Sequence, residues 1–399
     1  MILLRSAGRV GARPSLCHDD SAGERRVEER AGHDVERSNA GPLLAVGGYV
    51  AARLAGLVVL APWAGRRHIG LLHLLATRSD ATWYLGIARH GYDAGQGQSN
   101  LAFFPLYPGL VAVVGRAVGW GAYPGLVVAW TAALVAAAGL FAVGDLVSGP
   151  RVGVVLAVLW GAVPHAVVET MGYSESLFTA LAAWSLYGLL RRRWLTAGLL
   201  CAAAGLTRPS AAALVPVLVV DAVVVLVRER PGWRAWRPVT AALLAPLGTA
   251  GYLGWVAWRT GRLDGWTHLQ RAGWGSSWDG GADAVQQAGH VLSGEQPLEL
   301  FMVTGVVVTA VLLGVLCVVD RQAWQLTAYA LASLAVTVGS AGYYYAKARF
   351  LLTAFPLLLP VAVSLARGGR ARRWLVLVAL VAGSAWFGGY LLLVWRWSP

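Results

Sequence analysis

The sequence predicts an all-α polytopic membrane protein. Three observations carry that prediction: the hydrophobicity, the length of the apolar segments and the placement of the arginines. Hydrophobic residues make up 57% of the 399 residues and charged residues only 13%, too few charges to cover a soluble protein of this length. Apolar segments close to the roughly 20 residues that span a bilayer recur from Pro42 onward. Short arginine-rich loops separate them, as the positive-inside rule leads us to expect.

The basic charge does not indicate a nucleic-acid partner. The basic residues behind the net charge of +13 are arginines apart from Lys347, and they cluster in short loops between apolar segments. Such loops indicate the lipid bilayer as the partner. The cysteines Cys17, Cys201 and Cys317 have neither disulfide nor zinc spacing. We therefore expect no metal and no other cofactor.

About eleven helices are expected to cross the membrane. The first covers residues 42–63, and residues 1–41 before it lack hydrophobic periodicity, which is typical of a disordered cytoplasmic tail. Residues 42–399 form the transmembrane domain. Residues 101–119 are rich in Pro and Gly and contain Arg116, so we expect them to dip into the membrane without crossing it. The other spans are expected at 124–147, 152–169, 174–190, 194–206, 209–227, 238–258, 300–319, 322–340, 350–366 and 374–395.

The arginine clusters at 191–193 and 367–373 predict which loops face the cytoplasm. With those loops inside, the N-terminus is also inside, and the two long polar loops at 63–108 and 260–297 are outside. The polar residues with possible chemistry then share the external face. These residues are Asp80, Glu169, Glu175, Arg208, Lys347 and Arg349.

The segment from Ser79 to Pro108 is the first long polar interruption after an apolar span. Ser79 or Asp80 can cap a short helix that ends at Gly91, because a short side-chain oxygen accepts a free backbone N–H. Trp83, Tyr84, Ile87 and Ala88 share one face of that helix, which is typical of a helix lying in the membrane interface. From the residues alone, Asp80 is either this cap or a general base at the water edge of the membrane.

Two motifs resemble the PIG-V mannosyltransferases and their bacterial relatives. They are D-A-x-W-Y-x-x-I-A-x-x-G-Y with A-F-F-P-L-Y-P, at 80–92 and 102–108, and Y-S-E-S-L-F at 173–178. The resemblance extends over about 43–366, although the family often has Trp where this chain has Ser79. It implies a GT-C-type enzyme that transfers mannose from a polyprenyl-phosphate donor to an external lipid- or protein-linked acceptor, with inversion. It also implies that Asp80 deprotonates the acceptor hydroxyl. The residues expected to line or support the pocket are Tyr84, His90, Tyr92, Phe104, Tyr107, His165, Tyr173 and Glu175.

Three basic residues are candidates for holding the donor phosphate. Arg208, between two apolar segments, either pairs with a nearby carboxylate or grips a phosphate, and its Thr-Arg context resembles the family's. Lys347 and Arg349 follow the tyrosines 343–345, which are typical of an aromatic belt. A second phosphate contact would explain these two cations on the external side. In the acidic motif, Ser174 is expected to cap a helix with Glu175 in its first turn.

The second external loop allows two interpretations. Its tryptophans could cover the apolar face of a sugar whose hydroxyls bond to its acids, or the loop could be a plain interfacial surface. Its candidate residues are Trp266, His268, Trp274, Trp278, Asp279, Asp283 and His290, and their spacing does not indicate a metal.

Two other classes of protein remain open from the sequence. A polyprenyl-lipid transporter or flippase could use the same basic pocket, but it needs polar groups through the depth of the membrane. The gathering of the polar residues at one face favours the enzyme. An assembly protein without activity is the third class, and Asp80 argues against it.

Overall fold

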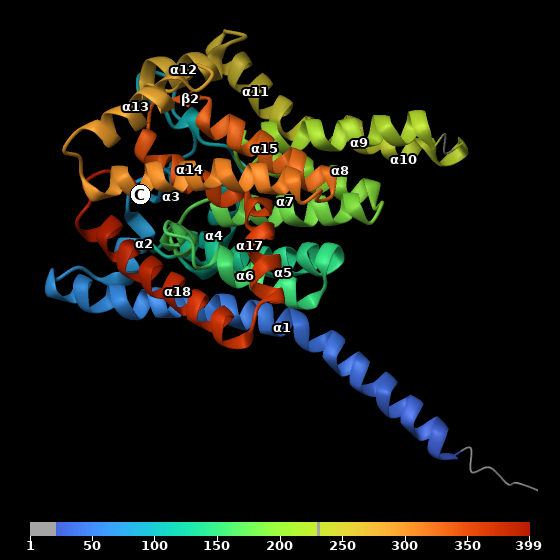
Figure 1. Ribbon diagram of the computed structural model, residues 1–399. Coiled ribbons are helices and arrows are strands. Elements are labelled where there is room, and N and C mark those ends of the chain that lie inside the picture. Colours follow the sequence, from blue (N-terminus) through green and yellow to red (C-terminus); the bar gives the residue numbers. More distant parts are fainter. Residues whose placement is uncertain (1–20, 230–231) are drawn as a thin grey trace, which may run out of the picture. The chain divides into compact units, whose positions relative to one another are not determined.

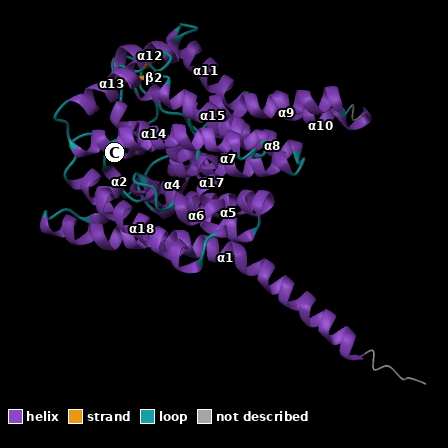
Figure 2. Cartoon of the chain, in the orientation of Figure 1, coloured by secondary structure: helices purple, strands orange, loops and turns teal. Residues whose placement is uncertain are grey.

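The computed structural model describes residues 21–229 and 232–399, with side chains from residue 40 onward, and the described part is almost wholly helical (Figures 1 and 2). The α-helices are α1 (Ser21–Arg66), α2 (Leu71–Thr77), α3 (Asp80–His90), α4 (Leu106–Val118), α5 (Pro124–Ser148), α6 (Pro150–Trp160), α7 (Glu175–Leu190), α8 (Trp194–Gly205), α9 (Leu214–Arg228), α10 (Trp236–Leu244), α11 (Leu247–Thr260), α12 (Gly265–Trp274), α13 (Ala282–Ser293), α14 (Leu298–Val319), α15 (Trp324–Val338), α16 (Lys347–Phe350), α17 (Leu359–Arg367) and α18 (Arg370–Leu393). The 3-10 helices are η1 (Asn100–Ala102), η2 (Ala166–Thr170), η3 (Pro209–Ala213), η4 (Gly232–Ala235), η5 (Tyr344–Ala346), η6 (Leu351–Thr353) and η7 (Phe355–Leu358).

Strands are confined to one small pair in the described part of the chain. β1 (Ser277–Trp278) and β2 (Ser340–Ala341) run antiparallel, with Ser277 opposite Ala341 and Trp278 opposite Ser340. The pair joins the second predicted external loop to the segment that follows α15. The all-α class predicted from the sequence is confirmed.

The described part of the chain has fewer helices long enough to span a membrane than the eleven that the sequence predicts. Among the described residues, six helical segments are long and apolar enough to span a membrane, and a seventh counts if the pair Tyr344–Thr353 and Phe355–Arg367, bent by 79°, is one span. The six are Ala40–Arg66, Pro124–Ser148, Pro209–Arg228, Gly232–Thr260, Leu298–Val319 and Arg370–Leu393. The predicted spans at 152–169, 174–190, 194–206 and 322–340 are covered only by shorter helices.

The prediction of one continuous span at 152–169 is wrong. α6 ends at Trp160, and a turn leads to η2. Gly161 and Pro164 lie in this turn, and proline has no N–H to continue a helix. The predicted tail, residues 1–41, lies partly outside the described residues, and the part from Ser21 onward belongs to α1.

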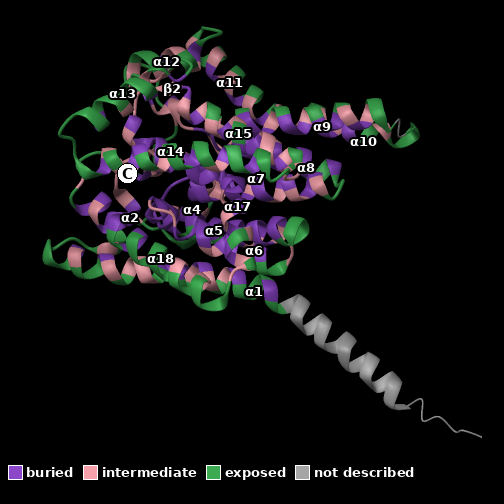
Figure 3. Cartoon of the chain, viewed as in Figure 1, coloured by how far each residue is buried: buried purple, intermediate pink, exposed green. Residues whose placement is uncertain are grey.

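The core of residues 41–399 is built on close helix contacts around α5, α6 and α7 (Figure 3). A Cβ added to Gly144 on α5 would lie 2.7 Å from the Cα of Gly153 on α6, so only glycine permits this approach. Large apolar side chains on α14 are exposed, including Val308, Leu312 and Val315. An exposed apolar helix face is what lipid contact requires.

The two ends of this bundle differ. α2, α3, α13 and the C-terminus lie at one end, at the left of Figure 1, and the turns α7–α8 and α9–α10 lie at the other. Arg192 and Glu229 form an ion pair at 2.7 Å between those two turns. Which end faces the cytoplasm stays a prediction from the arginine pattern.

Candidate functional site

Asp80 begins α3 at a strained turn. Ser79 has φ 49° and ψ −118°, a conformation that residues with a Cβ rarely adopt, and its side chain makes no capping hydrogen bond. The Asp80 N–H is instead directed to the Tyr173 hydroxyl at 3.3 Å. Of the two predicted caps, Ser79 is therefore not one, because the N–H groups that its side chain would bind, those of Ala81 and Thr82, donate to the backbone carbonyls of Arg78 and Ser79. α3 ends before Gly91 as predicted, but φ 80° and ψ −166° place this glycine outside the left-handed helical conformation that we expected for the stop.

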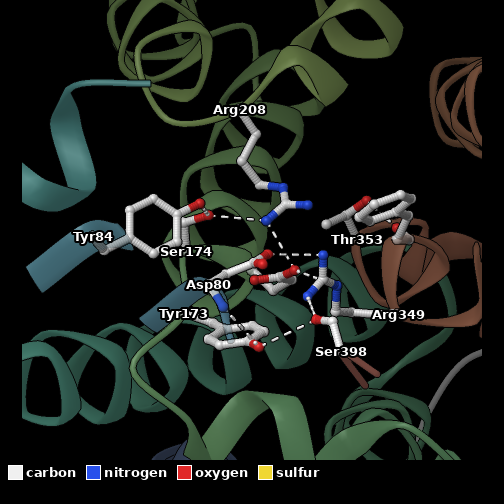
Figure 4. A network of polar contacts seen from close by, with 10 residues as sticks. Asp80, Tyr84, Tyr173, Ser174, Arg208, Arg349, Thr353 and Ser398 are labelled. Carbon is white, nitrogen blue, oxygen red and sulfur yellow. Dashed lines mark hydrogen bonds and ion pairs between the residues drawn. The ribbon is translucent and has the colours of Figure 1, made fainter. Parts of the chain in front are cut away.

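Four charged residues from four segments meet beside this turn (Figure 4). Arg349 Nη2 lies 2.9 Å from Asp80 Oδ2, and Arg349 Nε lies 3.3 Å from Glu175 Oε1. Arg208 Nη1 lies 2.9 Å from the same Glu175 oxygen. Negative and positive charges therefore alternate along the order Asp80–Arg349–Glu175–Arg208. We call these four residues the charged cluster. Of the three predicted basic residues, Arg208 and Arg349 belong to it.

The two carboxylates of the charged cluster differ in accessibility. The Asp80 side chain is 20% exposed and that of Glu175 is 0% exposed. Both arginine side chains are nearly buried. The Asp80 side chain is therefore partly open to solvent, whereas Glu175 contacts only groups of the protein.

Hydroxyl groups surround the charged cluster. Ser174 Oγ accepts a hydrogen bond from Arg208 Nη1 at 2.9 Å and lies 2.7 Å from the Tyr84 hydroxyl. The prediction that Ser174 caps α7 is therefore wrong: its side chain makes no capping hydrogen bond, because it is turned toward Arg208. Tyr84, predicted as a pocket residue, is buried and reaches the charged cluster through this serine.

The arginines also stack on aromatic rings. The Arg349 guanidinium lies 5.1 Å from the centre of the Tyr173 ring and 5.0 Å from that of Phe350. The Arg208 guanidinium lies 5.6 Å from the Phe350 ring. Cation–π contacts of this kind hold a guanidinium plane in place. Phe350 was not among the predicted site residues, although its position next to Arg349 in the sequence was an available signal.

Lys347 does not join the charged cluster. It is buried, and its Nζ donates to the backbone carbonyls of Thr337 at 3.1 Å, Val338 at 3.5 Å and Ser340. Carbonyls at the end of a helix have no partner within it, so an ammonium group can satisfy them. Lys347 therefore closes the end of α15, and the function proposed below uses the two arginines.

The other predicted pocket residues form an outer layer. Tyr107 packs on Tyr84 with ring centres 4.7 Å apart and donates to the Gly125 carbonyl, and Tyr92 donates to the Phe103 carbonyl at 2.9 Å. Phe104 packs on Tyr252 with ring centres 4.5 Å apart.

The two predicted histidines lie outside the charged cluster. His90 is exposed at the end of α3. His165 is buried against Phe387, with 5.4 Å between the ring centres, and neither of its ring nitrogens has a hydrogen-bond partner in the described part of the chain.

The second predicted external loop packs against the first and donates hydrogen bonds to its backbone. Trp274 donates from Nε1 to the Ser99 carbonyl at 3.0 Å, and its ring lies 5.2 Å from Trp83 and 5.3 Å from Phe103. Trp266 Nε1 donates to the Ala102 carbonyl at 3.4 Å. These bonds fix the backbone of the A-F-F-P motif beside α3.

Three further candidates of the second loop are at least partly exposed. Trp278 is exposed in β1, His268 is half-buried, and His290 is exposed. Within the residues that the structure describes, no three His, Cys, Asp or Glu side chains are grouped as metal ligands.

The chain matches no protein-family model, and no curated protein matches it. It does resemble two crystal structures of ArnT from Cupriavidus metallidurans, one bound to undecaprenyl phosphate and one in the apo state. The TM-scores are 0.52 and 0.50, with 14% identity in each case. Each match covers 83% of this chain and 61% of the ArnT chain, so this chain spans about three fifths of the length of ArnT.

At 14% identity this likeness shows the fold alone: the chain shares the helical fold of the two ArnT structures. The narrower resemblance to the PIG-V mannosyltransferases is not confirmed by these comparisons and stays a prediction.

Proposed function

We propose that this protein is a membrane glycosyltransferase that moves a sugar from a polyprenyl-phosphate donor to an external acceptor hydroxyl. The observation that carries the proposal is the charged cluster, in which one accessible carboxylate lies 2.9 Å from a buried arginine, within a GT-C fold. The ArnT structure with undecaprenyl phosphate supports a polyprenyl-linked donor. Mannose is the sugar that the resemblance to PIG-V favours, and the acceptor is an external glycan, glycolipid or protein.

The two arginines suit the phosphate of such a donor. A guanidinium presents a planar fork that binds phosphate oxygens in pairs, and it keeps its charge when buried. Arg208 and Arg349 share one Glu175 oxygen at 2.9 Å and 3.3 Å, which holds the two guanidiniums close enough together for one phosphate to contact both. Because both guanidiniums are held by stacking, little reorganisation is needed when negative charge develops on the leaving phosphate.

Asp80 suits the role of general base. The acceptor oxygen gives its proton to the Asp80 carboxylate as it forms a bond to the anomeric carbon of the sugar. The bond from that carbon to the phosphate oxygen breaks, its electron pair leaves with the polyprenyl phosphate, and the anomeric centre is inverted. Asp80 is the partly exposed carboxylate of the pair, so an acceptor hydroxyl can approach it.

Glu175 suits a positioning role. It is fully buried, and its Oε1 atom lies within 3.3 Å of both guanidiniums, which places the two cations side by side. Without that carboxylate, the two positive charges would repel each other in a medium of low dielectric constant.

The test is transfer by the purified protein. Radiolabelled polyprenyl-phosphate-mannose is incubated with the protein and membrane lipids, and we expect the wild type to form labelled product about a hundredfold or more faster than Asp80→Asn. Asp279→Asn is the matched control, because Asp279 accepts hydrogen bonds from backbone N–H groups and not from an arginine. Equal transfer by the wild type and Asp80→Asn would remove the proposed base. Donor binding without transfer would instead fit a lipid transporter.

A further inference from the structure

The segment after α18 folds back over the charged cluster. The Trp395 and Trp397 rings lie 6.3 Å and 6.4 Å from the Tyr345 ring. Arg78 Nη2 donates to the Trp395 carbonyl at 2.8 Å, and Arg67 Nη1 donates to the Leu393 carbonyl. These contacts bring the non-helical residues 394–399 to the end of the bundle that holds Asp80.

Ser398 reaches the charged cluster directly (Figure 4). Its Oγ accepts a hydrogen bond from Arg349 Nη1 at 3.0 Å and lies 3.4 Å from the Tyr173 hydroxyl. The side-chain nitrogens of Arg349 thus face three different partners: Nη2 and Nε lie within ion-pair distance of Asp80 and Glu175, and Nη1 donates a hydrogen bond to Ser398. Two of these partners are charged, and Ser398 is the neutral one.

We propose that the Ser398 hydroxyl occupies the position at Arg349 that an oxygen of the donor phosphate takes on binding. The inference rests on the proposed function, in which Arg349 holds that phosphate. A phosphate oxygen forms a charge-assisted bond to a guanidinium, which is stronger than the bond that a neutral hydroxyl forms. The incoming phosphate therefore displaces the neutral partner and leaves Asp80 in reach of the acceptor.

Ser398 is less buried than Ser174, the other serine that accepts a hydrogen bond from an arginine of the charged cluster. Ser174 Oγ accepts from Arg208, but Ser174 is fully buried between η2 and α7. Ser398 is half-buried on a segment without helix, between the exposed Trp397 and the buried Pro399. Displacing Ser398 requires the non-helical residues 394–399 to shift, whereas displacing Ser174 would disturb the start of α7 in the core.

The test measures the affinity of the purified full chain for undecaprenyl phosphate in detergent. We expect Ser398→Ala to bind roughly twofold to tenfold more tightly, because one hydrogen bond no longer competes with the ligand. Ser398→Thr keeps the hydroxyl and should bind like the wild type. Ser398→Asp should bind at least about tenfold more weakly, because its carboxylate pairs with Arg349.

Matched controls come from Ser293, an exposed serine whose Oγ bonds to the Gly289 carbonyl within α13. Ser293→Ala and Ser293→Asp should leave the affinity unchanged. Yield and melting temperature of each variant show whether it is folded.

Three results would overturn the inference. Weaker binding by Ser398→Ala would make Ser398 a positioning residue for Arg349, and unchanged binding would remove it from the phosphate position. In both cases, loss of binding in Arg349→Ala would leave the proposed function intact. A folded wild type that does not bind undecaprenyl phosphate at all would overturn the proposed function and this inference together.

Discussion

The acidic residues of the two predicted external loops have different kinds of partner. In the first loop, Asp80 lies 2.9 Å from a guanidinium. In the second, Asp279 accepts hydrogen bonds from the backbone N–H groups of Gly281 at 2.8 Å and Asp283 at 2.6 Å. Asp283 accepts from the Gly342 N–H at 3.3 Å. An aspartate beside a helix start therefore stabilises a turn where backbone N–H groups face it, and belongs to the charged cluster where a guanidinium faces it.

Asp93 shows that the distinction also holds within the first loop. It accepts hydrogen bonds from Ser99 Oγ at 2.6 Å and from the N–H groups of Asn100 at 2.8 Å and Gly95 at 2.9 Å. Burial alone would raise the pKa of Asp93, but these bonds and the charge of Arg259 together lower it below its ordinary value. Asp93 therefore shapes the loop, while Asp80 faces the arginine.

The largest expected effect is on turnover in Asp80→Asn. Loss of the general base should lower the rate of sugar transfer by about a hundredfold or more. Asparagine keeps the shape of the side chain, and Asp80 is partly exposed, so the melting temperature should change little. Single-turnover transfer and thermal melting on the same preparation check both points. A rate close to that of the wild type would place Asp80 with the turn residues.

Arg208→Ala should act mainly on the donor. Without one of the two guanidiniums, we expect the apparent KM for the lipid donor to rise by roughly ten- to a hundredfold, the range of a lost charge-assisted bond in a buried site. The KM for the acceptor should change much less. Arg208→Lys should recover only part of the loss, because an ammonium lacks the fork. Equal changes in both KM values would contradict a role at the phosphate.

Glu175→Gln should lower stability more than Asp80→Asn does. Glu175 is 0% exposed and lies between two buried guanidiniums, so its loss leaves them without their shared counter-charge. Breaking a buried pair in this way reduces the free energy of unfolding by about 3–5 kcal/mol. Denaturant unfolding in detergent measures this difference. If Asp80→Asn were the less stable variant, Asp80 and not Glu175 would contribute more to the free energy of unfolding.

The smallest expected effect belongs to Asp279→Asn. Hydrogen bonds from the N–H groups of Asp283 and Gly281 lower the pKa of Asp279 in the folded protein. A lowered pKa contributes stability above the unfolded value of about 4, and this contribution is lost as the pH falls through the folded pKa. We therefore expect the variant to reduce the melting temperature slightly at pH 7, with the difference disappearing in acid, and to leave transfer unchanged. A strong loss of transfer in this variant would mean that Asp279, and with it the second loop, takes part in the reaction.

The sequence by itself determined the elements and most of the charged residues of the site. Hydropathy and helix-stop residues are local signals, so the spans at 42–63 and 124–147 and the helix end at Gly91 could be predicted. Motif resemblance selected Asp80 and Glu175 before any geometry was known.

The tertiary structure decided which of these residues meet. Arg349 and Lys347 are two positions apart, yet only Arg349 points to Asp80, while Lys347 binds the carbonyls at the end of α15. Ser398 reaches Arg349 from the far end of the chain, and no local pattern marks it. The physical reason is that a buried charge takes its partner from whichever segment packs against it, and that packing depends on the whole bundle rather than on neighbours in sequence.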